Sequence, residues 1–125
     1  MSLTLDFDQF HHELASRTES ARRIAGPLRS SLAPIAFRLP DGRAYTIGAD
    51  TTAFWVRASV DDAATVVELS EDDWRAFATE RFTRYGLLYN GRISFASGSF
   101  EELCHWEPPL RALFHGRPVY QPQSI

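Results

Sequence analysis

The pattern of apolar and polar positions predicts a sheet. Apolar side chains alternate with polar ones over residues 35–39 and again through Tyr45 and Ile47. The Pro-Asp-Gly turn at 40–42 lies between these segments and reverses the chain, so they form a hairpin. The same alternation and a run of β-branched residues predict three more strands, over residues 52–60, 65–69 and 92–95.

A helix is predicted directly after the strand at 65–69. Ser70 is followed three residues later by Asp73, which is the spacing of a capping box. The acidic run 71–73 also places negative charge at the positive end of the helix dipole. Trp74 and Phe77 then recur at helical spacing and mark the buried side.

Helices are also predicted near both ends of the chain. The first begins at an aspartate near residue 6, ends at the Gly-Pro pair 26–27, and leaves His11 largely off its apolar stripe. The last begins at Phe100 and is predicted to be interrupted by the prolines at 108–109, which lack a backbone N–H. Residues 81–89 fit either a short helix or a loop.

Together these elements predict an α+β fold, with a five-stranded, mostly antiparallel sheet covered by helices on one face. A chain of 125 residues with 44% hydrophobic side chains is long enough for one domain with a sizeable core. Residues 108–125 are predicted to form a C-terminal arm or linker.

Charge and composition narrow the classes of function. A net charge of -3 with no basic run disfavours nucleic acid as a partner. All thirteen basic residues are arginine, so lysine Schiff-base chemistry is excluded. A single cysteine forms no internal disulfide and favours a reducing cytoplasm. We expect neither a signal peptide nor stable membrane insertion, because no segment approaches the ~20 apolar residues of a membrane span.

The candidate catalytic and metal-binding residues lack the spacing that a catalytic pair or a set of metal ligands needs. His11 and His12 are adjacent and point about 100° apart on a helix, which does not match the i, i+4 spacing of a zinc helix. Cys104 and His105 diverge in the same way, and we expect Cys104 to be a buried, inert thiol. The sequence has no glycine-rich phosphate loop and no nucleophile elbow. We therefore predict no catalytic residues, no metal and no cofactor.

The order of the motifs resembles the sterol carrier protein 2 lipid-binding family. A strand leads into a helix capped by Ser-Glu-Asp, and a Gly-basic-aliphatic strand then leads into a C-terminal helix. The residues that match the second motif are Gly91, Arg92, Ile93, Phe95 and Gly98. The resemblance covers residues 35–114. The chain departs from the family at the proline pair and at the apolar patch around Gly86, and we expect these departures to shrink or fill the tunnel.

The resemblance implies non-catalytic binding and transfer of a fatty acid, fatty acyl-CoA or sterol-like lipid in an apolar tunnel between sheet and helices. The sheet and the helical cover would line this tunnel with Phe54, Val56, Phe77, Phe82, Leu87, Leu88, Phe95, Leu103 and Trp106.

A second class of function stays open on the residues alone. The chain could be an accessory or interaction domain with a filled core, whose exposed aromatic side chains form a homodimer or partner surface. A co-purifying apolar ligand favours the first interpretation, and concentration-dependent dimerisation without a ligand favours the second.

Overall fold

A computed structural model describes residues 6–14, 32–49, 54–79, 81 and 84–115. Its elements, in chain order, are α1 (Phe7–Leu14), β1 (Ile35–Arg38), β2 (Ala44–Ala49), β3 (Phe54–Arg57), β4 (Thr65–Glu68), α4 (Glu71–Ala78), α5 (Arg84–Tyr89), β5 (Ser94–Ser97) and α6 (Phe100–His115). The five strands form one sheet in the order β3-β2-β1-β4-β5.

The sheet is mostly antiparallel, as predicted. Strand β1 pairs antiparallel with β2 and parallel with β4, while the pairs β2–β3 and β4–β5 are antiparallel. The parallel pair arises because the chain leaves the edge strand β3 and crosses to β4 on the far side of β1. The Thr46 hydroxyl donates to the Ser59 carbonyl at 2.5 Å and fixes the start of this crossover.

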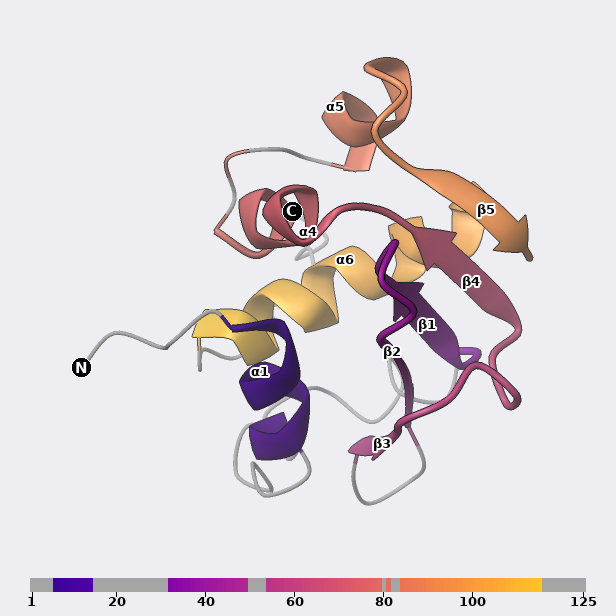
Figure 1. Ribbon diagram of the computed structural model, residues 1–125, viewed down its shortest axis with the longest axis vertical. Coiled ribbons are helices and arrows are strands. Elements are labelled where there is room, and N and C mark those ends of the chain that lie inside the picture. The colour runs from indigo at the N-terminus through magenta and orange to yellow at the C-terminus, as the bar shows by residue number, and fades with distance from the viewer. Residues whose placement is uncertain (1–5, 15–31, 50–53, 80, 82–83, 116–125) are drawn as a thin grey trace, which may run out of the picture.

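Helices α1, α4 and α6 lie on the same side of the sheet (Figure 1), which confirms the predicted α+β layering. The strand register aligns the apolar side chains that face these helices. Ile35 lies opposite Ile47, and Phe37 lies between Tyr45 and Val67. These five side chains are at most 8% exposed, so the core fills the space between the sheet and the helices.

The predicted local signals at turns and helix starts are present. Asp6 caps α1 by accepting a hydrogen bond from the Gln9 amide at 2.9 Å. Ser70 caps α4, because its hydroxyl accepts from the Asp73 amide at 3.0 Å. Gly42 has a φ of 97° in the predicted hairpin turn, a conformation that glycine adopts without strain. The ambiguous segment 81–89 contains the short helix α5.

The predicted interruption of the last helix is wrong. Helix α6 continues through Pro108 and Pro109 to His115, although an interior proline costs roughly 3 kcal/mol. Trp106 and Leu110, on either side of the pair, are both fully buried. The Trp106 Nε1–H also donates to the Ala33 carbonyl at 2.6 Å. Burial on both sides of the prolines therefore holds the helix direction against the lost backbone bonds.

Two other predictions reach beyond the described residues. The predicted end of the first helix at 26–27 lies outside them, and α1 is described only as far as Leu14. Of the segment predicted as an arm, residues 108–115 belong to α6 and the remainder lies outside the described residues.

Candidate ligand-binding site

The predicted ligand-lining side chains lie in one apolar layer between the sheet and the helices. The members with at most 5% of their surface exposed are Phe54, Phe77, Leu87, Leu103 and Trp106. Val56, Leu88 and Phe95 are partly buried and pack against them, and Phe82 lies outside the described residues. The fold thus brings the described members together as part of its hydrophobic core.

Neighbouring rings in the apolar layer are close to one another. The ring centroids of Phe54 on β3 and Trp106 on α6 are 5.9 Å apart, and those of Phe37 and Phe77 are 6.5 Å apart. Because these side chains shield one another from solvent, a ligand has to reach the layer from its edge. Val56 lies at such an edge.

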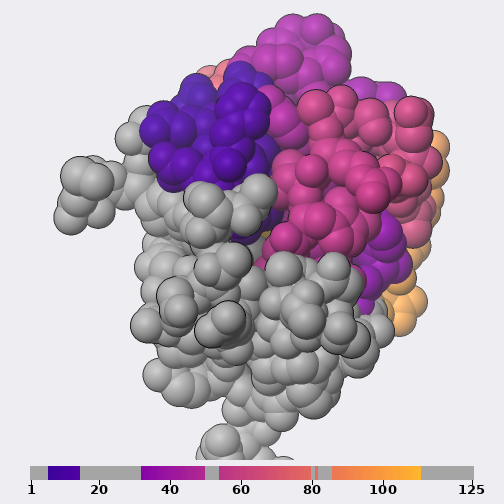
Figure 2. Space-filling model, turned by 90° about the horizontal axis from the view of Figure 1, so that it is seen from below, coloured from indigo at the N-terminus to yellow at the C-terminus, as the bar shows by residue number. Residues whose placement is uncertain are grey.

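A pocket of about 280 Å³ opens at this edge, between α1 and strands β2 and β3. It is lined by His11, His12, Tyr45, Val56 and Ala58 and is called the His11 pocket below. Figure 2 shows this face of the molecule, with α1 in indigo beside the magenta segment that begins with β3. Val56 belongs both to the His11 pocket and to the edge of the apolar layer.

His11 is buried, so the prediction that it lies off the apolar stripe of its helix is wrong. Only 1% of its surface is exposed. Its ring stacks on Tyr45 at a centroid distance of 4.4 Å and an angle of 9°. The rings of Phe7 and Phe10 contact it in edge-to-face geometry, at centroid distances of 4.7 and 5.3 Å. Aromatic rings on several sides accommodate the imidazole as a flat, neutral group.

The hydrogen bonding of His11 leaves one nitrogen unused. Its Nδ1 lies 2.7 Å from the Phe7 carbonyl, and because a carbonyl can only accept, Nδ1 carries the hydrogen. Nε2 is then an acceptor, and it is buried without a hydrogen-bond partner in the described structure. Burial lowers the pKa of His11 to about 4, so the ring is neutral at pH 7.

Asp8 and Tyr45 form the polar end of the His11 pocket. The Tyr45 hydroxyl donates to Asp8 Oδ1 at 2.7 Å and lies 3.4 Å from His12 Nε2. This hydrogen bond, together with Arg43, lowers the pKa of Asp8, which is therefore an ionised carboxylate. Burial, followed by the bond to Asp8, raises the pKa of Tyr45 to about 12, so the phenol keeps its proton.

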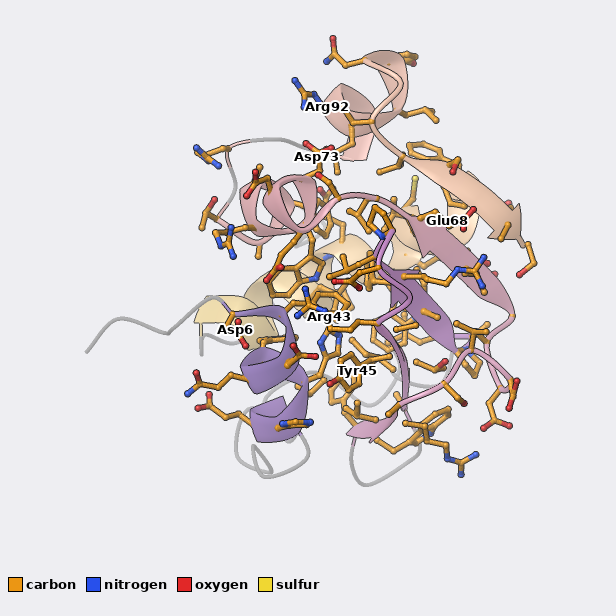
Figure 3. The ribbon with its side chains drawn as sticks, in the orientation of Figure 1. Asp6, Arg43, Tyr45, Glu68, Asp73 and Arg92 are labelled. Carbon is orange, nitrogen blue, oxygen red and sulfur yellow. The ribbon has the colours of Figure 1, made fainter. Side chains whose placement is uncertain are left out.

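Arg43 connects this polar end to the rest of the fold. Its guanidinium donates to Asp8 Oδ2 at 2.5 Å, to Asp41 Oδ2 at 2.9 Å and to Glu71 Oε1 at 2.8 Å. Figure 3 shows Arg43 and Tyr45 between the sheet and α1. The three carboxylates raise the pKa of Arg43 above its ordinary value. They hold the starts of α1 and α4 to the hairpin turn, and Glu71 also pairs with Arg75 at 3.4 Å.

Neither the Arg43 cluster nor the His11 pocket was predicted from the sequence. Glu71 was expected only to support the start of its helix, whereas it also pairs with Arg43, 28 residues earlier. Asp8 lies 35 residues before Arg43. The one local signal was the Asp41–Arg43 pair within the hairpin turn, where the carboxylate also accepts from the Arg43 amide at 2.9 Å.

Two other hollows have charged groups that already pair with each other. One, of about 330 Å³, includes Arg38 and Glu68, which bond at 2.8 Å across β1 and β4. The other includes Asp73 and Arg92, which bond at 3.0 Å (Figure 3). Neither shows the combination found in the His11 pocket, where a buried acceptor without a donor adjoins the apolar layer.

Solved structures share this architecture. The sterol carrier protein domain 2 of Helicoverpa armigera matches with a TM-score of 0.61 and 13% identity, over 94% of this chain and 91% of that one. The structure described as "UbiJ-SCP2 Ubiquinone synthesis protein" matches with a TM-score of 0.60 and 11% identity, over 85% of this chain and 93% of that one. The chain has the sterol carrier protein 2 fold.

The sterol carrier protein 2 fold of this chain also matches part of a larger enzyme. The stereoselective inverting sec-alkylsulfatase Pisa1 from Pseudomonas sp. aligns with a TM-score of 0.61 and 13% identity, over 93% of this chain. This chain spans only 17% of that enzyme's length. No protein-family model matches the sequence, and no curated protein matches it. At these low identities the likeness shows the fold alone.

In the part of the chain that the structure describes, few side chains could bind a metal ion or act as a nucleophile. Within it, no cluster of three or more His, Cys, Asp or Glu side chains could hold a metal ion. Cys104 is half-buried, which corrects the expectation of a buried thiol, and its neighbour His105 is exposed. None of the described helices is both long enough and apolar enough to cross a membrane.

Proposed function

We propose that this chain binds an apolar small molecule, such as a fatty acid, fatty acyl-CoA or sterol-like lipid, and carries it without converting it. The observation that carries this proposal is the continuity between the His11 pocket and the apolar layer through Val56. The ligand's apolar part would pack against the layer at this edge. The occurrence of the same fold in proteins described as sterol carrier proteins supports the proposal.

Burial of an alkyl chain supplies enough free energy for such binding. Ten methylenes removed from water contribute about 8 kcal/mol at roughly 0.8 kcal/mol each. Loss of ligand freedom and ordering of side chains offset part of this gain. The remainder corresponds to dissociation constants on the order of micromolar or weaker.

The ionisable groups of the His11 pocket support binding rather than catalysis. A general acid or base works best with a pKa near the operating pH. Burial lowers the pKa of His11 to about 4 and raises the pKa of Tyr45 to about 12. The Asp8 carboxylate already accepts hydrogen bonds from Tyr45 and Arg43. These groups are matched to holding a polar end of a ligand, not to proton transfer near pH 7.

Native mass spectrometry of the purified protein, followed by solvent extraction, tests the proposal directly. We expect an apolar species to accompany the protein at concentrations above the micromolar dissociation constant. If none is present, the bare protein should take up a fluorescent fatty acid. A bare protein that takes up no probe would contradict carrier function.

Filling the edge of the apolar layer should reduce uptake. Val56 is partly buried and lines the His11 pocket, so Val56→Trp occupies ligand space with little disturbance of the fully buried core. We expect at least a tenfold loss of fatty-acid affinity in a fluorescence titration. Ala96→Trp places the same side chain on the exposed surface of β5 and serves as the matched control. Equal uptake by both variants would count against this edge as the entrance.

A second candidate function is an accessory domain that forms a homodimer or binds a partner. The observation that favours it is the near-complete burial of Phe77, Leu103 and Trp106, as in an ordinary core. A similar structure is described as a ubiquinone synthesis protein, and that description does not mention lipid carriage. Light scattering over a hundredfold concentration range separates the two, because only this candidate requires association in the absence of any apolar ligand.

A further inference from the structure

The turn that follows α5 contains Asn90, the only asparagine in the chain, and Gly91 directly after it. Both residues are exposed. Figure 1 shows α5 at the opposite end of the molecule from α1, so this turn lies apart from the proposed ligand entrance. Gly91 has a φ of 67°, and a Cβ placed there would have no atom within 4 Å in the described structure. Neither a side chain of its own nor a packed neighbour therefore crowds the Gly91 nitrogen.

Hydrogen bonds at the end of α5 hold this turn closed. The Gly91 amide donates to the Leu88 carbonyl at 3.1 Å, and Asn90 Nδ2 donates to the Gly86 carbonyl at 2.6 Å. Both bonds have to open before the Gly91 nitrogen can reach Cγ of Asn90. A helix of six residues is marginal by itself, and exposed helix ends open at little cost in free energy. The turn therefore opens without unfolding of the domain.

The other turn of this kind, Asp41–Gly42, is protected by its neighbours. Gly42 is equally open, with a φ of 97° and no atom within 4 Å of a Cβ. The Asp41 carboxylate, however, accepts from the Arg43 amide and from Arg43 Nε, both at 2.9 Å. The bond from the amide, with the guanidinium, lowers the pKa of Asp41, so this group is ionised at pH 7. An ionised carboxylate resists attack by a nucleophile, whereas the neutral amide of Asn90 can release ammonia.

We propose that Asn90–Gly91 is a site of spontaneous covalent modification, which converts the side-chain amide of Asn90 into a carboxylate. The Gly91 nitrogen loses its proton to solvent and bonds to Cγ of Asn90, which closes a five-membered ring. The bond between Cγ and Nδ2 breaks, and Nδ2 leaves as ammonia. Water then opens the cyclic imide at either of its two carbonyls and leaves aspartate or isoaspartate. The net reaction consumes one water and releases one ammonia, without any oxidant or reductant.

Both products weaken the end of α5. Each loses the donor to the Gly86 carbonyl and places negative charge at the carboxyl end of a helix, where it is unfavourable. Isoaspartate also lengthens the main chain by one methylene, which displaces the amides of Gly91 and Arg92. The Arg92 amide donates to the carbonyl of Leu87 at 2.9 Å, and Leu87 is fully buried in the core. We therefore expect the modification to loosen α5 on the apolar layer.

Peptide mapping of the aged protein tests the inference. Folded protein is kept at pH 7 and pH 8, beside a sample unfolded in guanidinium chloride. The tryptic peptide 85–92 contains Asn90 and no glutamine, so its mass reports on this residue alone. We expect conversion in the folded protein, faster at pH 8 because the nitrogen must lose a proton, with isoaspartate detected by isoaspartate methyltransferase labelling. Folded protein that stays unmodified while the unfolded chain is converted would overturn the inference.

Two variants test the chemical route and its consequence. Gly91→Ala leaves Asn90 in place and adds a Cβ in open space. We expect it to be converted roughly tenfold more slowly, because a side chain restricts the backbone conformations that bring the nitrogen onto Cγ. Asn90→Asp reproduces one product, so the Gly91 and Arg92 amides should exchange their hydrogens faster than in the unmodified protein. Equal conversion of Gly91→Ala would overturn the cyclic route, and unchanged exchange in Asn90→Asp would overturn the effect on α5.

Discussion

Acidification from pH 7 to pH 4 is expected to remove about 3 kcal/mol of stability through His11 alone. Burial lowers the pKa of His11 from 6.5 to about 4 in the folded protein. The unfolded chain therefore takes up the proton first as the pH falls. The contribution is complete above pH 6.5 and is lost progressively between pH 6.5 and about 4. A loss of this size is a large fraction of the 5–15 kcal/mol typical of a folded domain.

Neighbouring charges modify this titration without reversing it. On α1, the Asp8 carboxylate raises the pKa of His11, and His12 lowers it. From the sheet side, Tyr45 stacks on the ring as a neutral phenol, and Arg43 is bound to Asp8. Asp8 has its own lowered pKa, so its contribution is lost only at pH values below its ordinary value of 3.8. Among the groups that surround His11, none therefore cancels its contribution between pH 6.5 and 4.

Urea unfolding at pH 7, 5.5 and 4.5 measures the effect. The variant His11→Phe should lose the part of the pH dependence that His11 contributes, since phenylalanine has no proton to bind. The control His105→Phe removes an exposed histidine on α6 and should keep the pH dependence of the unmodified protein. An unchanged pH dependence in His11→Phe would show that the acid sensitivity arises elsewhere.

Much of the fold could be predicted because its signals are local. Alternation along the strands, the Pro-Asp-Gly turn and the Ser70 cap each act within a few residues, and the structure contains all of them. Two of the errors have a common cause. Both predictions treated the residues as exposed to solvent. Instead, His11 is buried against Tyr45, and the burial of Trp106 and Leu110 keeps α6 continuous through Pro108 and Pro109.

The candidate site could be predicted less well, because long-range contacts build it. Val56 was predicted to line a ligand site only through a family resemblance. Its position beside His11 could not be predicted, since that proximity depends on how α1 packs on β3. The bond between Tyr45 and Asp8 likewise joins residues 37 positions apart. The family resemblance supplied the predicted apolar lining, and the polar groups beside it became visible only in the structure.

Replacing Gly98 with alanine is expected to destabilise the protein by about 3 kcal/mol. Gly98 has a φ of 77°, and a Cβ there would lie 2.0 Å from Thr65 Oγ1 and 2.5 Å from Thr65 Cα. Thr65 is fully buried on the interior strand β4, so its backbone cannot easily move away. Left-handed strain contributes about 1 kcal/mol and overpacking about 2 kcal/mol. The contact would also disturb the bond from the Ser99 amide to Thr65 Oγ1, at the start of α6.

Gly91→Ala is the matched control, because it introduces the same methyl group at a similar φ of 67° with no atom within 4 Å. It should lose only the conformational strain, about 1 kcal/mol. Urea unfolding of both variants at pH 7 therefore separates backbone strain from the close approach of residues 98 and 65. Equal losses would mean that β4 yields to the added methyl group. A larger loss for Gly98→Ala would show that the two glycines of one sequence motif serve different purposes, with Gly91 turning the chain and Gly98 letting the start of α6 pack closely on β4.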